Sequence, residues 1–183
     1  MDLDRTLGRP ILRSYLREQT SDLHQRLDAQ VGSFASVAQY RAFVGQSLTF
    51  RRMAEPVCAG FAPWNALSLI DDMASDLADL DGALPLSSPS PVVLRDPAAR
   101  LGALYVLEGS SLGARLLFRR AEALGFTERF GARHLARQSG DRERWRAFVE
   151  LLDASTFAPS AVAAGAVLLF EAALEIYGEA LIG

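Results

Sequence analysis

Apolar residues recur with helical spacing through almost the whole chain, and runs of alternating apolar and polar residues bounded by turn residues are missing. This pattern predicts an all-α fold. We expect helices over residues 10–31, 37–60, 65–82, 97–125, 127–138, 141–154 and 158–182. Since the chain has 183 residues, half of them hydrophobic, a single domain over residues 1–183 with a sizeable core is expected.

The residue types present exclude several kinds of chemistry. All nineteen basic residues are arginine, so no lysine is available for a Schiff base, for pyridoxal phosphate or for a phosphate-binding loop. The lone cysteine, Cys58, excludes an intramolecular disulfide, and its apolar neighbours favour an inert core thiol over a nucleophile. No apolar run is long enough for a membrane span, and the N-terminus lacks a hydrophobic signal core, so a cytoplasmic protein without a membrane is expected.

Charge is distributed unevenly along the sequence. Residues 71–81 carry five aspartates, whereas residues 115–146 carry nine arginines against four acidic residues. A solvated helix face explains each run; the alternative for the basic segment is docking of an acidic protein. Without interleaved aromatic residues, the basic segment does not favour nucleic-acid binding. Residues 82–96, with three prolines and three serines, predict one long surface loop.

Residues 101–115 predict a helix that carries three glycines on one side. At about 100° per residue, Gly102, Gly109 and Gly113 fall within about 40° of one another. Each interior glycine costs about 1 kcal/mol of helix stability relative to alanine, so a compensating reason is expected. We expect a flat or bulky group to come very close to this backbone; close packing of another helix is the alternative.

A histidine and a carboxylate stand one turn apart on the first predicted helix. His24 lies at the edge of the apolar stripe, and Asp28 follows at i+4, where its carboxylate can reach an imidazole nitrogen. A metal-ligating histidine commonly has such a partner, although a simple surface contact gives the same spacing. Arg17 shares the face of His24 and could anchor the anionic edge of a cofactor held there. Tyr105, on the rim of the glycine stripe, could offer its hydroxyl to that edge; solvent exposure or core packing explains either residue as well.

Other metal and catalytic motifs are missing from the sequence. His134, the remaining histidine, has no cysteine or histidine at zinc-ligand spacing, and no Glu-x-x-His pair of a di-iron site occurs. The only G-S-S-L-G segment is within a predicted helix, without the strand that a hydrolase elbow requires. His24 is left as the plausible metal ligand. A metal with one protein ligand indicates a macrocycle that supplies the others, namely haem.

Two segments carry a resemblance to a known family. One is L-R-x-x-T-x-x-x-H-x-x-x-D from Leu16 to Asp28, and the other is L-Y-V-L-E-G-S-S-L-G-A from Leu104 to Ala114. With the helical pattern over nearly the whole length, the chain resembles the bacterial biliverdin-forming heme oxygenases, particularly the type associated with bacteriophytochromes.

The resemblance implies a heme oxygenase-like fold of many helices, with haem between a proximal helix and a kinked distal helix. His24 would then ligate the iron. The distal residues implied in catalysis are Gly109, Ser110 and Gly113. The residues implied in cofactor binding are Arg17, Thr20, Asp28 and Tyr105.

The implied reaction uses haem as both cofactor and substrate and cleaves it with O₂ to biliverdin, CO and ferrous iron. A ferredoxin or its reductase would supply electrons, and a bacteriophytochrome is an implied acceptor of the product. No basic residue occurs from Ala147 to Gly183, where some relatives place one on the last helix, so the bilin isomer stays open. A non-catalytic haem-binding or haem-delivery protein with the same fold is the alternative function, and a cofactor-free helical interaction module is a third.

Overall fold

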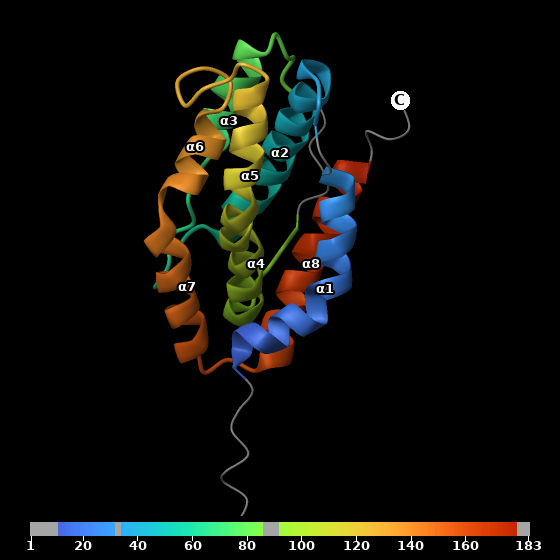
Figure 1. Cartoon of the computed structure of the whole chain (residues 1–183). Helices are drawn as coiled ribbons and strands as arrows, with labels where there is room; N and C mark the ends of the chain where they lie inside the picture. The colour runs from blue at the N-terminus through green and yellow to red at the C-terminus, as the bar shows by residue number, and fades with distance from the viewer. Residues whose placement is uncertain (1–10, 32–33, 86–91, 179–183) are drawn as a thin grey trace, which may run out of the picture.

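The computed structural model describes residues 11–31, 34–85 and 92–178, which form eight helices joined by loops (Figure 1). These helices are α1 (Leu12–Val31), α2 (Val37–Cys58), α3 (Ile70–Asp79), α4 (Pro97–Gly109), α5 (Ser111–Ala123), α6 (Arg133–Gly140), α7 (Arg142–Ala154) and α8 (Pro159–Gly178). Within the described ranges, β-pairing is limited to isolated bridges near Thr127. The predicted all-α class is confirmed.

Helix α8 lies against both α1 and α4 (Figure 1). A Cβ atom built on Gly102 of α4 would lie 1.9 Å from the Val162 carbonyl oxygen, and one built on Gly165 of α8 would lie 1.9 Å from the Ala99 carbonyl oxygen. Neither position has room for a side chain, so α4 and α8 touch backbone to backbone. For Gly102, therefore, close packing of another helix is the correct explanation of the missing side chain.

The apolar composition of α8 follows from this central position. Among the described helices it is the one with the length and hydropathy to cross a membrane, and half of its most apolar window is buried inside the protein. The larger apolar core gathers around it and includes Leu16, Leu104, Phe148 and Phe170. Cys58 belongs to the same core and is 1% exposed; burial raises the pKa of its thiol to about 12, which confirms the prediction of an inert thiol.

A second apolar cluster joins α2, α3, α5 and α6 at the other end of the molecule. Its buried members include Tyr40, Phe43, Leu77 and Leu135. Tyr177, near the end of α8, packs against both clusters. The two apolar clusters are therefore in contact through Tyr177.

The predicted helix over residues 97–125 is divided in two at Ser110. The hydroxyls of Ser110 and Ser111 donate to the carbonyls of Leu107 and Glu108, at 2.6 and 2.7 Å. Serine bonds to preceding carbonyls compete with the backbone ladder and bend helices. The kinked distal helix that the family resemblance implies corresponds to this break between α4 and α5.

Two other predicted helices begin later than expected. The helix predicted from residue 65 begins at Ile70, and the one predicted from residue 127 begins at Arg133 because Thr127–Gly131 forms a turn. The described parts of the predicted loop over 82–96 are not helical, and residues 86–91 lie outside the described ranges.

Asp76 of α3 caps the first turn of α6 from a distant part of the sequence. Its carboxylate accepts the backbone N–H groups of Arg133 and His134, both at 3.0 Å, and lies 2.7 Å from Nδ1 of His134. Asp76 and His134 are fully buried. The side chain of Arg133 also pairs with Asp76, at 2.9 Å, and with Asp79.

The acidic run over residues 71–81 and the basic segment therefore neutralise each other in part. Arg137 of α6 pairs with Asp72 of α3 at 2.8 Å, beside the pairs of Arg133. Two of the nine arginines in the basic segment, Arg133 and Arg137, thus meet aspartates of the acidic run. Asp76, Asp79 and Arg133 pack between α3 and α6, so for them the prediction of a solvated helix face is wrong, whereas Arg137 stays more than half exposed.

Replacing Asp76 with asparagine is expected to lower the free energy of unfolding by about 1–3 kcal/mol at pH 7, because the buried carboxylate satisfies several donors. Burial alone would raise the pKa of Asp76, but hydrogen bonds from His134 and Arg133 outweigh it and hold that pKa below its usual value. The carboxylate's contribution is then complete above the unfolded pKa of about 3.9 and is lost as the pH falls through the lower folded value.

Urea unfolding followed by circular dichroism at pH 3 to 7 measures this effect. The difference in unfolding free energy between wild type and Asp76→Asn should become smaller below about pH 4. Asp72→Asn is the matched control, since the pair of Asp72 with the exposed Arg137 is expected to contribute less than about 1 kcal/mol. A difference for Asp76→Asn that is equally large at pH 3 and pH 7 would contradict this account.

Candidate functional site

His24 stands on α1 with its side chain 60% exposed to solvent. Its Nδ1 lies 3.0 Å from Oδ2 of Asp28, as the i+4 spacing predicts, and its ring lies 5.8 Å from that of Phe170 on α8. A carboxylate at Nδ1 favours the tautomer with the proton on that nitrogen. The lone pair of Nε2 is then available to a metal.

Three of the predicted cofactor-binding residues come together where α1 approaches α4. Tyr105 of α4 forms a side-chain hydrogen bond with Thr20 and interacts electrostatically with the guanidinium of Arg17; both of these residues belong to α1. Burial raises the pKa of Tyr105, and the guanidinium of Arg17 and the bond with Thr20 oppose the rise. Thr20 is 2% exposed and donates to the carbonyl of Leu16 at 2.8 Å, whereas Arg17 is exposed.

Gly113 lies on an open face of α5. A Cβ atom built there would have no neighbour within 4 Å, and no positive φ calls for a glycine at this position. Leu112 and Leu116 beside it are 64% and 49% exposed. This side of α5 therefore presents bare backbone and uncovered apolar side chains together, a surface suited to a flat apolar group.

Gly109, at the end of α4, has different surroundings. A Cβ atom there would meet the ring of Trp145 at 3.7 Å, an ordinary contact distance. Trp145 also lies 6.1 Å from the ring of Tyr105. The three glycines of the predicted stripe thus divide by role: Gly102 packs against α8, Gly109 lies beside Trp145, and Gly113 faces open space.

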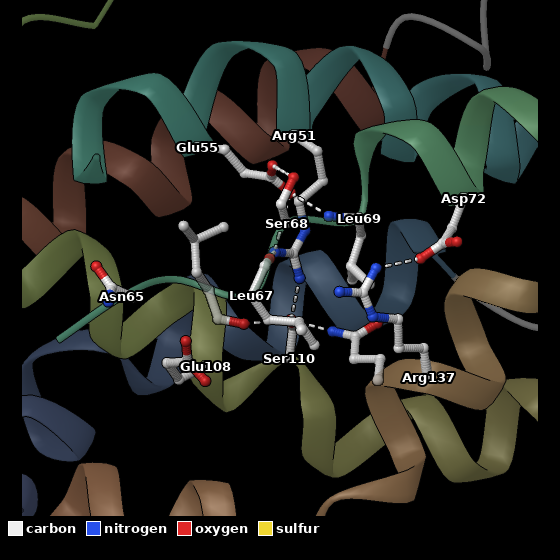
Figure 2. A network of polar contacts seen from close by, with 12 residues as sticks. Arg51, Glu55, Asn65, Leu67, Ser68, Leu69, Asp72, Glu108, Ser110 and Arg137 are labelled. Carbon is white, nitrogen blue, oxygen red and sulfur yellow. Dashed lines mark hydrogen bonds and ion pairs between the residues drawn. The ribbon is translucent and has the colours of Figure 1, made fainter. Parts of the chain in front are cut away.

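Ser110 lies at the break between α4 and α5 and is the centre of a polar network (Figure 2). Its hydroxyl donates to the carbonyl of Leu107 and accepts from Nη2 of Arg51 at 3.2 Å and from Nε2 of Gln138 at 2.6 Å. A serine hydroxyl has one donor and two acceptor positions, so all three are used. Helices α2 and α6 are thereby connected to the break.

Glu108, next to Gly109, is buried in a second polar cluster. It accepts from Nε1 of Trp64 at 3.0 Å and from Nε and Nη2 of Arg144 at 2.8 and 2.7 Å. Such a two-pronged arginine–carboxylate pair fixes geometry as well as charge. The end of α4 is therefore held from α7, on the side away from α1 (Figure 1).

Apart from Ser110, the residues of these networks were not predicted from the sequence. Arg51 and Glu55 stand at i, i+4 among apolar neighbours on α2, a spacing typical of an ion pair, and this signal could have identified them. Gln138 and Arg144 carry no such local signal, because their partners come from other helices.

The donor set on α1 and the open face of α5 fit haem. His24 offers an imidazole nitrogen held by Asp28, and Arg17 with Tyr105 offers a cation and a hydroxyl suited to carboxylates. Gly113 gives a wall without side chains. In the part of the chain that the structure describes, three or more His, Cys, Asp or Glu side chains nowhere gather to hold a metal ion.

Comparison with known proteins gives two matches that agree. The chain is 40% identical over 167 residues to heme oxygenase PigA of Pseudomonas aeruginosa, covering 81% of this chain and 83% of that protein. It also superimposes on a crystal structure of the NO- and CO-bound heme oxygenase from Neisseria meningitidis, with a TM-score of 0.77 and 27% identity over 93% of this chain and 94% of that one. No family model matches the sequence.

Proposed function

Since the chain belongs to the heme oxygenase family, we propose that it opens haem with O₂ and electrons to biliverdin, CO and ferrous iron, at a site formed by α1 on one side and α4 and α5 on the other. It is an enzyme, and haem is both its substrate and its prosthetic group. Bound haem supplies the iron that activates O₂ and the ring that is opened. The observation that carries the placement is His24, whose Nε2 is available while Asp28 engages Nδ1.

His24 is the proposed iron ligand. The carboxylate of Asp28 orients the imidazole and holds the proton on Nδ1, which keeps Nε2 basic. The ring of Phe170 lies beside the imidazole and restricts its movement. Both groups favour one orientation of the ligand before haem binds.

Arg17, Tyr105 and Thr20 are the proposed binding residues for the haem propionates. A guanidinium and a phenol hydroxyl are both donors, and carboxylates are acceptors. The proton of the Thr20 hydroxyl is donated to the Leu16 carbonyl, so Thr20 can hold the phenol of Tyr105 only as an acceptor, and the phenol proton would turn to a propionate once haem is bound.

Gly109, Ser110 and Gly113 are the proposed catalytic residues of the distal side, and Ser110 contributes its backbone because all bonding positions of its hydroxyl are used. At Gly113 the absence of any neighbour lets a ligand reach the backbone itself, whose peptide groups can hydrogen-bond to a polar group there. The exposed Leu112 and Leu116 would exclude water once they are covered.

The reaction needs partners beyond haem. We propose a ferredoxin or its reductase as the electron donor, since ring opening consumes electrons, and a bacteriophytochrome as an acceptor of the biliverdin. We also propose that residues 1–183 act as one domain in the cytoplasm, away from membranes and nucleic acid. The contact of Tyr177 with both apolar clusters supports the single domain, and the pairing of Arg133 and Arg137 with α3 supports the absence of nucleic acid.

Reconstitution with haem followed by addition of O₂ and a chemical reductant tests the function. The Soret band should disappear while a bilin spectrum grows, and chromatography of the product then identifies the isomer. A Soret band that persists, with stable ferrous–O₂ haem, would instead indicate a haem-binding or haem-delivery protein. A protein that does not bind haem at all would contradict both haem cleavage and haem binding as its function.

A further inference from the structure

Arg51 is a buried cation behind the break between α4 and α5. It is 4% exposed, and burial lowers the pKa of its guanidinium, opposed by the charge of Glu55. Nη1 donates to the carbonyl of Leu67 at 3.3 Å and lies 3.6 Å from Oε1 of Glu55, while Nη2 donates to Oγ of Ser110. These contacts of the Arg51 side chain all lie within the fold.

Glu55 connects Arg51 to the segment that precedes α3. Its carboxylate accepts from Oγ of Ser68 and from the backbone N–H of Leu69, both at 2.8 Å, directly before α3. A chain of contacts thus runs from the start of α3 through Glu55 and Arg51 to Ser110 (Figure 2). Gln138 of α6 reaches the same hydroxyl from another direction.

Stability alone does not account for an arginine in this place. Burying an ion pair costs desolvation free energy, and apolar side chains of similar volume often give equal or greater stability. The pair of Arg51 and Glu55 adds a directional hydrogen bond, from Arg51 to Ser110, at one point of the chain. That point is Ser110, which stands between Gly109 and the open face at Gly113.

We propose that Arg51 is a positioning residue for haem cleavage: it holds Ser110, and through Ser110 it fixes the break between α4 and α5, so that the Gly109–Gly113 backbone keeps one position. This inference rests on the proposed function. Ser110 acts within it as a link to the backbone, because its hydroxyl is already fully bonded. Arg51 itself contacts no reacting atom.

The test compares the double variant Arg51→Met/Glu55→Gln with Arg52→Met. The double variant removes both charges but keeps side chains of similar length: the glutamine oxygen can still accept from the Leu69 N–H, and its NH₂ group can donate to the Ser68 hydroxyl. Arg52 is the exposed neighbour of Arg51 on the same helix, so Arg52→Met controls for loss of an arginine. Ser110→Ala is a second variant that removes the held hydroxyl and leaves the ion pair in place.

The first readout is hydrogen exchange of the peptide covering residues 107–114 in the haem-free protein. Loss of the charged hydrogen bond is expected to speed exchange there by about tenfold in the double variant and in Ser110→Ala. Arg52→Met should exchange like wild type. Circular dichroism and thermal unfolding show which variants are folded.

The second readout is turnover of haem by the loaded protein. We expect kcat to fall about tenfold in the double variant while the haem Kd changes less than about twofold, the pattern of an interaction that matters for the chemical step. Wild-type exchange or wild-type kcat in a folded double variant overturns the proposal. If that variant does not fold, the same two results for Ser110→Ala overturn it. If wild type itself fails to turn over haem, the proposed function falls, while the exchange experiment still decides whether Arg51 holds the break.

Discussion

Replacing His24 with alanine is expected to abolish haem turnover and the spectrum of the wild-type haem complex. The imidazole is the proposed ligand, and α1 provides an orienting carboxylate at its Nδ1. Loss of a partner outside the ligand shell already costs about 10–100-fold in metal affinity or activity, so loss of the ligand should cost more than about 100-fold. Haem titration followed by absorption spectroscopy, and a single-turnover assay, measure the two effects.

Gln25→Ala is the matched control for this variant, because Gln25 is the exposed neighbour of His24 on the same turn. It should bind and turn over haem like wild type. Asp28→Asn should keep the ligand but weaken it, with an intermediate loss of about 10–100-fold. Added imidazole should restore part of the ferric spectrum of His24→Ala. An unchanged spectrum in His24→Ala would show that another residue ligates the iron.

The second large effect concerns two glycines whose replacement by alanine should change the unfolding free energy in opposite directions. Gly102→Ala is expected to destabilise the haem-free protein by about 2–3 kcal/mol, because its Cβ would meet backbone atoms of Val162 and Ala166 at 1.9 and 2.7 Å, which no side-chain rotation relieves. Gly113→Ala meets nothing within 4 Å and should stabilise the helix by up to about 1 kcal/mol. Urea unfolding of the haem-free variants gives both values.

A larger residue at position 113 should affect haem binding or turnover without affecting the stability of the haem-free protein. Gly113→Leu should leave the unfolding free energy of the haem-free protein close to that of wild type, since the position faces open space. It should lower haem affinity or turnover by at least about tenfold, because the side chain occupies the space proposed for haem and O₂. A stable variant with wild-type haem turnover would contradict the proposed role of Gly113. Equal destabilisation by Gly102→Ala and Gly113→Ala would contradict the structural division between them.

Local patterns predicted the fold class and the pair on α1. Helical spacing of apolar residues depends only on the sequence, and it identified an all-α chain whose helix ends differ from the structure mostly by a few residues. The contact of His24 with Asp28 likewise follows from i+4 spacing within one helix. The glycine content of residues 101–115 correctly indicated a close approach, but the sequence did not distinguish packing at Gly102 from openness at Gly113.

The features that the sequence did not reveal depend on partners from distant segments. The start of α6 is set by Asp76, 57 residues before Arg133, so no local capping signal marks it. The hydroxyl of Ser110 at the break accepts from Arg51 and Gln138, which reach it only after α2 has packed against α4 and α6 against α5. The pairing of the acidic and basic runs arises in the same way, because α3 and α6 become neighbours only in the fold.

The most direct test of the central claim is a crystal structure of the chain with haem bound. We expect iron bonded to Nε2 of His24, propionates at Arg17 and Tyr105, and the Gly113 backbone against the opposite face of the ring. Iron bonded to any other residue, or haem seated away from the open face of α5, would contradict it.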